Sequence, residues 1–437
     1  MSSKPTVVAF YLPQYHPIPE NDAWWGKGFT EWTNVVRGRP VFDGHEQPIL
    51  PADLGFYDLR LPTVRHEQIK LAREFGVDAF CFYYYWFGGK RLLETPLEDW
   101  LNDRSADLPF CLCWANENWT RRWNGAEQDV LMAQQHSDAD DRAVMRDLIR
   151  YFKDSRYLRV DGRPVLLVYR IELFPDAQAT VMRWKEECAA AGVPLPLFCA
   201  VQSFGITDPR PYGFDAAVEF PPHGVVARTM SDEVSEQVDG FTGKIFSYRD
   251  VAEYCVSKPV VDYPRFRGVM PSWDNTARRP LSGHIYAGSS PLIFRAWLAR
   301  MMQKTMVDEY LPAKLLFVNA WNEWGEGCVL EPSQRFGKAW GQALRCAIED
   351  ADGSAKLWPF IPPADADYAS LRRFASLSIR ADATVCEVEA ELSRMRYLAE
   401  RAKPGLFARG YLLARLWVNR FPRVKRVLRN IVSRMNA

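Results

Sequence analysis

Two glutamates in the segment Leu-Leu-Phe-Val-Asn-Ala-Trp-Asn-Glu-Trp-Gly-Glu-Gly-Cys-Val-Leu-Glu-Pro, residues 315–332, have the spacing of a reactive pair. Glu323 and Glu326 follow an apolar run that is typical of a buried strand, and the neighbouring glycines disfavour a regular helix. Both carboxyl groups can therefore face one space, flanked by Trp321 and Trp324. Paired carboxyl groups beside aromatic rings suit glycosidic-bond chemistry, in which one acid stays protonated and the rings stack on sugars. A surface loop with solvated glutamates and core tryptophans is the alternative.

A second group of polar and aromatic residues directly follows the third predicted strand. Asn116, Glu117 and Trp119 place amide and carboxylate groups beside a ring, which is the combination that sugar hydroxyls need. These three side chains are predicted to form a binding subsite. The structural alternative is an ion pair of Glu117 with Arg121 or Arg122.

The long loop at 21–34 is too aromatic for a disordered linker, since it holds Trp24, Trp25, Phe29 and Trp32. Long loops in compact domains usually carry function. We expect this loop to form one wall of a cleft, and a packed lid without ligand contact is the alternative.

Strand-like and helix-like segments alternate along most of the sequence. Strands are predicted at Thr6–Tyr11, 78–84, 109–114, 164–169, 195–201, 215–219, 266–270 and 315–319, and helices at Pro62–Phe75, 138–153, 177–191, 248–256, Pro291–Val307 and 335–350. Eight strands alternating with helices predict an α/β fold, the closed (β/α)₈ TIM barrel, over residues 1–352. A doubly wound open sheet is the competing fold, but the first strand is not followed by a Gly-rich phosphate turn.

In such barrels the chemistry collects at the C-terminal ends of the strands. Those ends are rich here in aromatic, amide and acidic residues. His16 fits a structural histidine as well as a ligand contact. The predicted substrate-binding residues are Tyr11, Gln14, His16, Trp32, Tyr85, Trp86, Trp114, Asn116, Glu117, Trp119, Tyr169, Glu219, Trp273, Trp321, Asn322 and Trp324.

Charge and composition limit the partners. The net charge of +1 predicts no general attraction to nucleic acid. The nine cysteines show no paired spacing, and the six histidines are scattered, so we expect reduced thiols and no metal site. The sequence shows no secretion signal and no apolar run of about 18–20 residues. A cytoplasmic protein without a cofactor is expected.

The C-terminal part, 353–437, differs in composition from the barrel. A Pro-rich connector at 356–363 precedes a predicted helix at 382–402. After Glu400 there are ten Lys and Arg residues and no Asp or Glu. Apolar and basic residues alternate at 406–431, which is typical of an amphipathic helix on an anionic membrane. A helix docked on the acidic barrel is the alternative.

Four ordered motifs resemble the WbsX family, which is also described as glycoside hydrolase family 99-like. They are Ala-Phe-Tyr-Leu-Pro-Gln-Tyr-His at 9–16, Gly-Phe-Thr-Glu-Trp at 28–32, the segment 114–123, and Trp-Asn-Glu-Trp-Gly-Glu-Gly at 321–327 with Glu331 and Pro332. The resemblance covers roughly residues 5–350. Members of this family often accompany genes for O-antigen or other surface-glycan synthesis, and they are commonly labelled glycosyltransferases.

Family 99 itself comprises retaining, metal-independent endo-α-mannosidases and mannanases on a (β/α)₈ barrel. Its Glu-Trp-His-Glu-Gly motif is similar to residues 323–327, with Gly325 in place of the histidine. The resemblance implies that Glu323 is the base on the sugar 2-hydroxyl, which gives a 1,2-anhydro sugar, and that Glu326 is the general acid. Such roles require an ionised Glu323 and a raised pKa for Glu326.

The sequence thus predicts an enzyme that acts on glycosidic bonds of a bacterial surface polysaccharide, as a retaining endo-glycosidase or transglycosylase. The first alternative is a glycosyltransferase of O-antigen synthesis with an activated donor, although no Asp-x-Asp stands in a suitable loop. The second alternative is a glycan-binding or assembly protein without catalysis.

Overall fold

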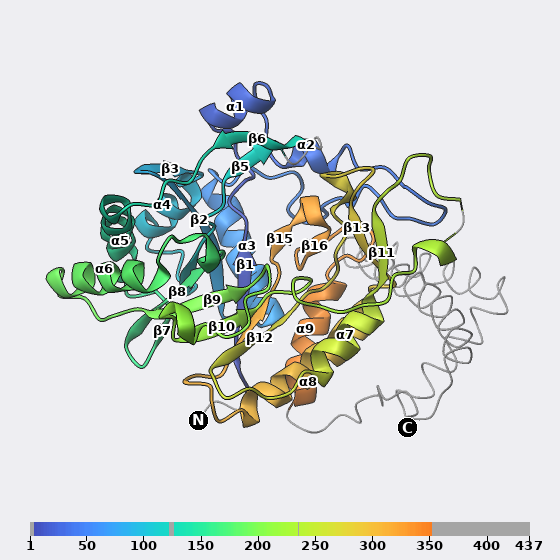
Figure 1. The fold of residues 1–437 in the computed structure, drawn as a ribbon. Coiled ribbons are helices and arrows are strands. Elements are labelled where there is room, and N and C mark those ends of the chain that lie inside the picture. Colours follow the sequence, from blue (N-terminus) through green and yellow to red (C-terminus); the bar gives the residue numbers. More distant parts are fainter. Residues whose placement is uncertain (1–3, 122–125, 235, 352–437) are drawn as a thin grey trace.

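The computed structural model describes residues 4–121, 126–234 and 236–351 of the 437-residue chain. Their centre is a ring of eight parallel strands (Figure 1). Strand β1 pairs with both β2 and β14, so the sheet closes on itself. The predicted (β/α)₈ barrel is confirmed. In ring order the strands are β1 (Thr6–Tyr11), β14 (Leu315–Val318), β12 (Arg265–Val269), β10 (Ala216–Glu219), β9 (Leu197–Gln202), β8 (Arg163–Val168), β4 (Phe110–Trp114) and β2 (Ala79–Phe87).

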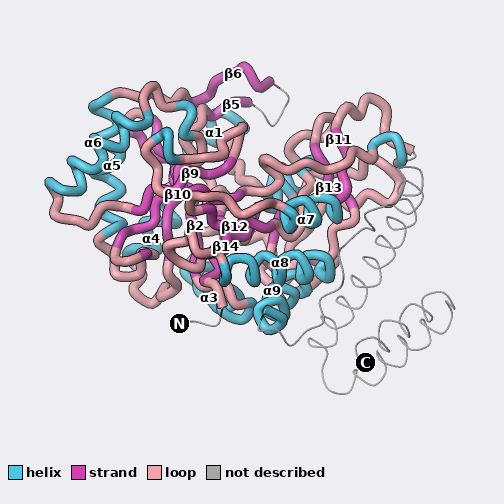
Figure 2. The backbone as a smooth tube through the Cα atoms, turned by 60° about the horizontal axis from the view of Figure 1, so that its bottom comes forward, coloured by secondary structure: helices cyan, strands magenta, loops and turns pink. Residues whose placement is uncertain are grey.

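Helices cover the outer face of the ring, and side chains packed inside the barrel bury the inner face, which explains the continuous apolar runs. The helices are α3 (Pro62–Phe75), α4 (Thr95–Asn102), α5 (Asp138–Phe152), α6 (Ala177–Ala190), α7 (Tyr248–Ser257), α8 (Pro291–Val307) and α9 (Ala339–Glu349). Between β9 and β10 a 3₁₀ turn, Arg210–Tyr212, replaces the helix. Helices α7, α8 and α9 lie side by side (Figure 2).

Side-chain caps fix where several helices begin. Ser137 accepts a hydrogen bond from the N–H of Asp140 at α5, and Asp176 and Ser290 cap α6 and α8 in the same way. Each cap satisfies a backbone donor that the first turn leaves unpaired. The helices that these residues open follow β4, β8 and β12, so the caps help to define the βα repeat.

Shorter elements follow the C-terminal ends of four barrel strands. They were not predicted, and they arise inside the segments expected to be loops or an insertion. They are α1 (Pro19–Trp25) and α2 (Trp32–Val35) after β1, the hairpin of β5 (Trp119–Arg121) and β6 (Ala126–Met132) after β4, β11 (Lys244–Ser247) after β10, and β13 (His284–Ala287) after β12. Strands β11 and β13 pair in parallel. Strands β3 (Lys90–Leu92) and β7 (Arg159–Val160) extend β2 and β8 by antiparallel pairing.

The predicted connector and basic tail, residues 353–437, lie outside the described residues, so membrane contact through this tail stays a prediction. Within the described ranges, no helix has the length and apolar character needed to cross a bilayer.

Candidate active site

A tight hairpin after β14 holds the two predicted acids. It consists of β15 (Asn322–Glu323), a 3₁₀ turn (Trp324–Glu326) and β16 (Cys328–Val329). Gly327 closes the turn with a φ of 59°, a left-handed conformation that glycine adopts easily. The hydroxyl of Tyr15 donates to the carbonyl of Asn322 at 2.7 Å and accepts from the N–H of Trp324 at 3.1 Å. The turn that separates the two acids is therefore fixed from the β1 side.

A second turn, after β12, carries Arg278 toward the hairpin. The turn is a 3₁₀ helix, Asn275–Ala277, and Asp274 caps it by accepting from the N–H of Thr276 at 3.0 Å. His45 and Gln47 each contact the other carboxylate oxygen of Asp274 at 2.7 Å. The backbone N–H of Asp274 donates to the carbonyl of Glu326 at 2.7 Å. The two turns are thus joined by a backbone hydrogen bond.

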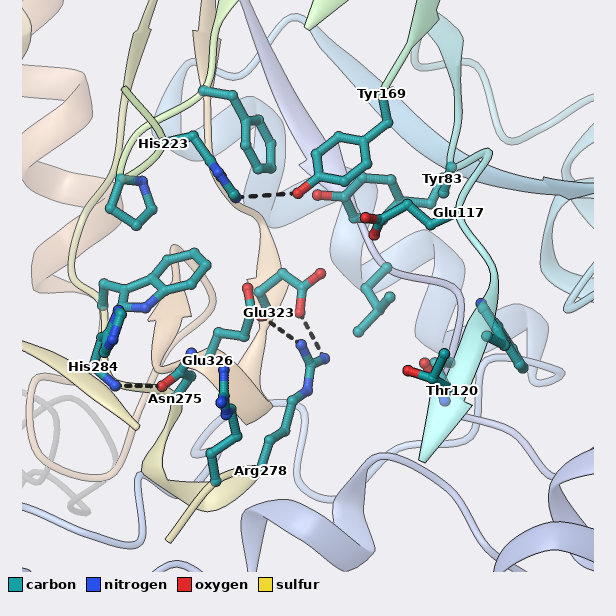
Figure 3. A pocket seen from close by; sticks show the side chains of 18 of the residues that line it. Tyr83, Glu117, Thr120, Tyr169, His223, Asn275, Arg278, His284, Glu323 and Glu326 are labelled. Atoms are coloured by element: carbon teal, nitrogen blue, oxygen red, sulfur yellow. Dashed lines mark hydrogen bonds and ion pairs between the residues drawn. The ribbon is translucent and has the colours of Figure 1, made fainter. Parts of the chain in front are cut away.

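Arg278 forms ion pairs with three carboxylates. Its Nε lies 2.6 Å from Glu31, its Nη2 lies 2.9 Å from Glu323, and its Nη1 lies 2.8 Å from Glu326. Figure 3 shows the guanidinium below the two hairpin acids. Glu31 is completely buried, whereas the side chain of Glu326 is 22% exposed and that of Glu323 6%. The acid pair therefore converges on a shared cation while both members still reach the pocket.

Burial changes the protonation of both acids. It raises the pKa of Glu323 to about 8; Arg278 opposes this shift, and Glu326 and Glu31 reinforce it. Burial also raises the pKa of Glu326, again against Arg278 and with Glu31. The raised pKa of Glu326 agrees with the expectation from the sequence. The sequence leads us to expect an ionised Glu323, whereas the raised pKa favours its protonated form at neutral pH. The reason is that Glu323 is more enclosed than Glu326 and shares Arg278 with two other carboxylates.

A pocket of about 600 Å³ opens above the acid pair, a size typical of ligand sites. Figure 3 shows Tyr83 and Glu117 on one side of the acids and Asn275 and His284 on the other. Eight of the predicted site residues line this pocket: Gln14, Tyr85, Glu117, Trp119, Tyr169, Trp273, Glu323 and Glu326.

Two of these residues have informative hydrogen-bond geometry. The Nε2 of Gln14, a residue that lines the pocket, is buried without a hydrogen-bond partner among the described residues. The Tyr169 hydroxyl lies 3.1 Å from Nε2 of His223. Burial lowers the pKa of His223 to about 4, so this histidine is neutral beside the pocket.

The ion pair of Glu117 is made with Arg170, at 2.5 Å. The alternative from the sequence named Arg121 or Arg122, whose side chains lie outside the description. Asn116 holds the backbone of Arg170: its amide donates to the Arg170 carbonyl and accepts from the Arg170 N–H, both at 2.8 Å. Asn116 is therefore buried as a brace between the β4 and β8 loops.

Ten predicted substrate-binding residues are buried and do not line the pocket: Tyr11, His16, Trp32, Trp86, Trp114, Asn116, Glu219, Trp321, Asn322 and Trp324.

Several of these residues satisfy structural hydrogen bonds. The indole of Trp86 donates to Asp140 on α5, and that of Trp32 donates to the carbonyl of Tyr57. Asn322 accepts from the N–H of Leu12 at 2.7 Å and donates to its carbonyl at 3.0 Å.

Four more of these residues are buried by ion pairs or by core packing. Glu219 lies between Lys258 and Arg265. Burial lowers the pKa of His16 to about 4, so it is a neutral core histidine. Trp114 and Trp321 are completely buried in the main core.

A buried hydrogen-bond network beside the hairpin explains why Tyr11 and Trp324 do not line the pocket. Glu331 accepts hydrogen bonds from Gln68 at 2.7 Å and from Tyr57 and the Trp324 indole, both at 2.8 Å. Tyr11 donates to the other end of the Gln68 amide at 2.8 Å. Burial raises the pKa of Glu331 to about 7, against these hydrogen bonds. This third acid of the motif supports the hairpin from behind.

Sequence reasoning missed several residues at the pocket. Arg278 is the most informative of them, because buried acids require a nearby cation and this arginine follows the β12 strand end. Strand alternation from Tyr85 would also have found Tyr83. The other missed residues that line the pocket include Phe204, His223, His284 and Tyr286.

In the described part of the chain, no group of three or more His, Cys, Asp or Glu side chains is arranged to hold a metal ion.

A parallel barrel with paired carboxyl groups and aromatic rings at the C-terminal ends of its strands has the architecture of a carbohydrate-active enzyme. A family model described as Glycosyltransferase WbsX matches residues 7–344. The chain therefore belongs to the WbsX family.

Two individual proteins are also similar to this chain. Two proteins named Uncharacterized protein WxcX, from strains B100 and ATCC 33913 of Xanthomonas campestris pv. campestris, are each 51% identical to this chain over 346 residues. The match covers 79% of this chain and 50% of each relative, so the chain spans about half the length of these curated relatives.

Solved structures share the fold. The GH99 endo-alpha-mannosidase from Bacteroides thetaiotaomicron has a TM-score of 0.50 and 12% identity, covering 80% of this chain and 98% of its own. A glycoside hydrolase-like protein has a TM-score of 0.51 and 13% identity, covering 79% and 94%. At such low identity these similarities describe the barrel alone.

Proposed function

We propose that this chain breaks or remakes glycosidic bonds of a bacterial surface polysaccharide, with Glu323 and Glu326 as the reacting acids. The observation that carries this proposal is their placement. Two enclosed carboxyl groups from one hairpin converge on the floor of a pocket lined by Trp119, Trp273 and Tyr286. Rings of this kind stack on sugar faces, and a carboxyl pair that holds a proton can serve a leaving oxygen.

We assign the chemistry to the pair as follows. Ionised Glu323 takes the proton of the sugar 2-hydroxyl, whose oxygen attacks the anomeric carbon as the glycosidic bond breaks. Glu326 gives its proton to the leaving oxygen. A water or a sugar hydroxyl then opens the 1,2-anhydro ring, while Glu326 takes the proton of that nucleophile and Glu323 returns a proton to the 2-oxygen. Water gives hydrolysis and a sugar hydroxyl gives transglycosylation.

One substitution and one substrate analogue test the roles separately. Glu326→Gln is expected to abolish action on substrates with poor leaving groups and to spare activated aryl glycosides, which need no protonation to depart. An equal loss on both would contradict the acid role. A substrate without a 2-hydroxyl should not turn over, and normal turnover of a 2-deoxy substrate would contradict the base role of Glu323.

The description of the matching family as a glycosyltransferase supports a second candidate function, sugar transfer from an activated donor. A screen of the purified chain against oligosaccharides, with and without sugar nucleotides, separates the two. Turnover without a sugar nucleotide supports glycosidase or transglycosylase action, and turnover only with one supports the transferase. Binding without any turnover would favour a glycan-binding protein. A location in the cytoplasm also stays a proposal that rests on the sequence.

A further inference from the structure

Each of the three nitrogens of the Arg278 guanidinium is committed to a different carboxylate. Nε contacts Glu31, which precedes α2, and the two terminal nitrogens contact Glu323 and Glu326. A planar guanidinium with donors in a fixed fork can satisfy three acceptors in set directions, which a single ammonium cannot do. The positions of the two pocket acids are therefore coupled to a third acid that is itself completely buried.

The charges around Arg278 do not balance. Three carboxylates face one guanidinium in an enclosed space, and several unbalanced buried charges are unfavourable, so the cluster retains protons. The neighbouring tyrosine and cysteine groups add no charge at neutral pH, because burial raises their pKa values well above their usual range. The titratable groups that face the cluster are Tyr15, Tyr83, Tyr85, Tyr169 and Cys328, together with Glu117, while Arg279 and His223 also line the pocket.

We propose that Arg278 is the positioning residue of the acid pair: anchored by Glu31 over Gly325, its guanidinium keeps Glu323 and Glu326 converging and sets how many protons they share. Gly325 is part of this device, since a Cβ built at this position would lie 2.0 Å from Oε1 of Glu31 and 2.8 Å from Nε of Arg278. The inference rests on the proposed function only in taking the acid pair as the reacting groups.

The direct test is a carboxyl titration that needs no substrate. Protein labelled with ¹³C at the glutamate carboxyl carbon is titrated by NMR, and Glu323→Gln and Glu326→Gln identify the signals of the pair. Arg278→Gln is expected to raise the titration midpoints of the pair by about one pH unit or more, because a nearby cation normally lowers a carboxyl pKa. Glu31→Gln is expected to lower them, because Arg278 would then serve two carboxylates instead of three.

Opposite shifts from the two substitutions are the signature of the proposal, since general loosening of the site would not move the midpoints in opposite directions. Arg267→Gln is the matched control, because Arg267 forms another buried ion pair, with Asp308 at 2.9 Å, and does not line the pocket. It is expected to leave the midpoints of the pair unchanged. Unchanged midpoints in a folded Arg278→Gln, or shifts of the same sign in both variants, would overturn the proposal.

Arg278→Lys keeps a charge but offers a single nitrogen. We expect smaller midpoint shifts than with Arg278→Gln, together with a loss of kcat that the retained charge does not rescue. Full activity of the lysine variant would contradict the positioning role. If Arg278→Gln does not fold, the midpoint shifts of Arg278→Lys and Glu31→Gln provide the test instead. Absence of turnover by the wild-type chain on every glycan would contradict the proposed function and leave the titration readout intact.

Discussion

The carboxylate of Glu31 occupies the space that a side chain at Gly325 would need, since a Cβ at position 325 would lie 2.0 Å from it. The two residues come from opposite ends of the barrel sequence and meet where the β1 loop crosses the hairpin after β14. A histidine stands between the two glutamates in the family 99 motif that this hairpin resembles. Here that position has to be free of a side chain, because Glu31 and Arg278 fill the space around it.

Gly325→Ala is therefore expected to lower the free energy of unfolding by about 1–3 kcal/mol, the usual cost of overpacking. The cost should be smaller in a Glu31→Ala background, where the colliding carboxylate is gone. A double-mutant cycle by denaturant unfolding measures this coupling. Costs that add without coupling would show that the collision is relieved elsewhere.

Activity should rise as the pH increases through about 8. Burial raises the pKa of Glu323 to about 8, so the carboxyl is mostly protonated below this pH, and the ionised form required of a base grows as the pH increases. The pH profile of kcat/KM on a substrate with a good leaving group measures this limb. A rate that stays flat or falls through the same range would contradict the base role of Glu323.

Trp119→Ala should weaken oligosaccharide binding by roughly 2–12-fold, which corresponds to about 0.5–1.5 kcal/mol for an aromatic contact. Trp119 lines the pocket beside Tyr85. Trp321→Phe is the control, because Trp321 is completely buried against Phe75 and Phe80 and should affect stability without changing affinity. Calorimetric titration and thermal unfolding of both variants separate the two effects.

Glu331→Gln is expected to lower the free energy of unfolding by about 1–3 kcal/mol at pH 5. The new amide N–H₂ would replace one carboxyl oxygen and face either the Gln68 donor on Oε1 or the Tyr57 and Trp324 donors on Oε2. The folded-state pKa of Glu331 is raised from 4.5 to about 7, so the wild type loses stability as the pH rises between these values. The difference between the two proteins should shrink over this range. Urea unfolding at several pH values measures it, and a growing difference would contradict the raised pKa.

The barrel could be predicted from the sequence because its signals are local. The bounds of β1, α3 and α8 agree with the predicted segments, and the other barrel strands differ by a few residues at their ends. Local patterns also placed Glu323 and Glu326, because both lie on one short hairpin that follows a barrel strand.

The rest of the site depends on which way each side chain points and on distant contacts. Tyr85 and Trp86 were both predicted to bind substrate, but adjacent strand residues point to opposite faces. Tyr85 lines the pocket and Trp86 reaches Asp140 on α5. Arg278 and Glu31 are 247 residues apart, so no local pattern could connect them.

The two hydrogen bonds between the Asn322 side chain and the Leu12 backbone join the loops that follow β14 and β1, the two strands whose pairing closes the ring. The same short hairpin that presents the acids thus also links the loops beside the closing strand pair. Because residues 315–331 are the last part of the ring and its hairpin to be synthesised, neither the closed barrel nor the acid pair can form before β14 docks against β1.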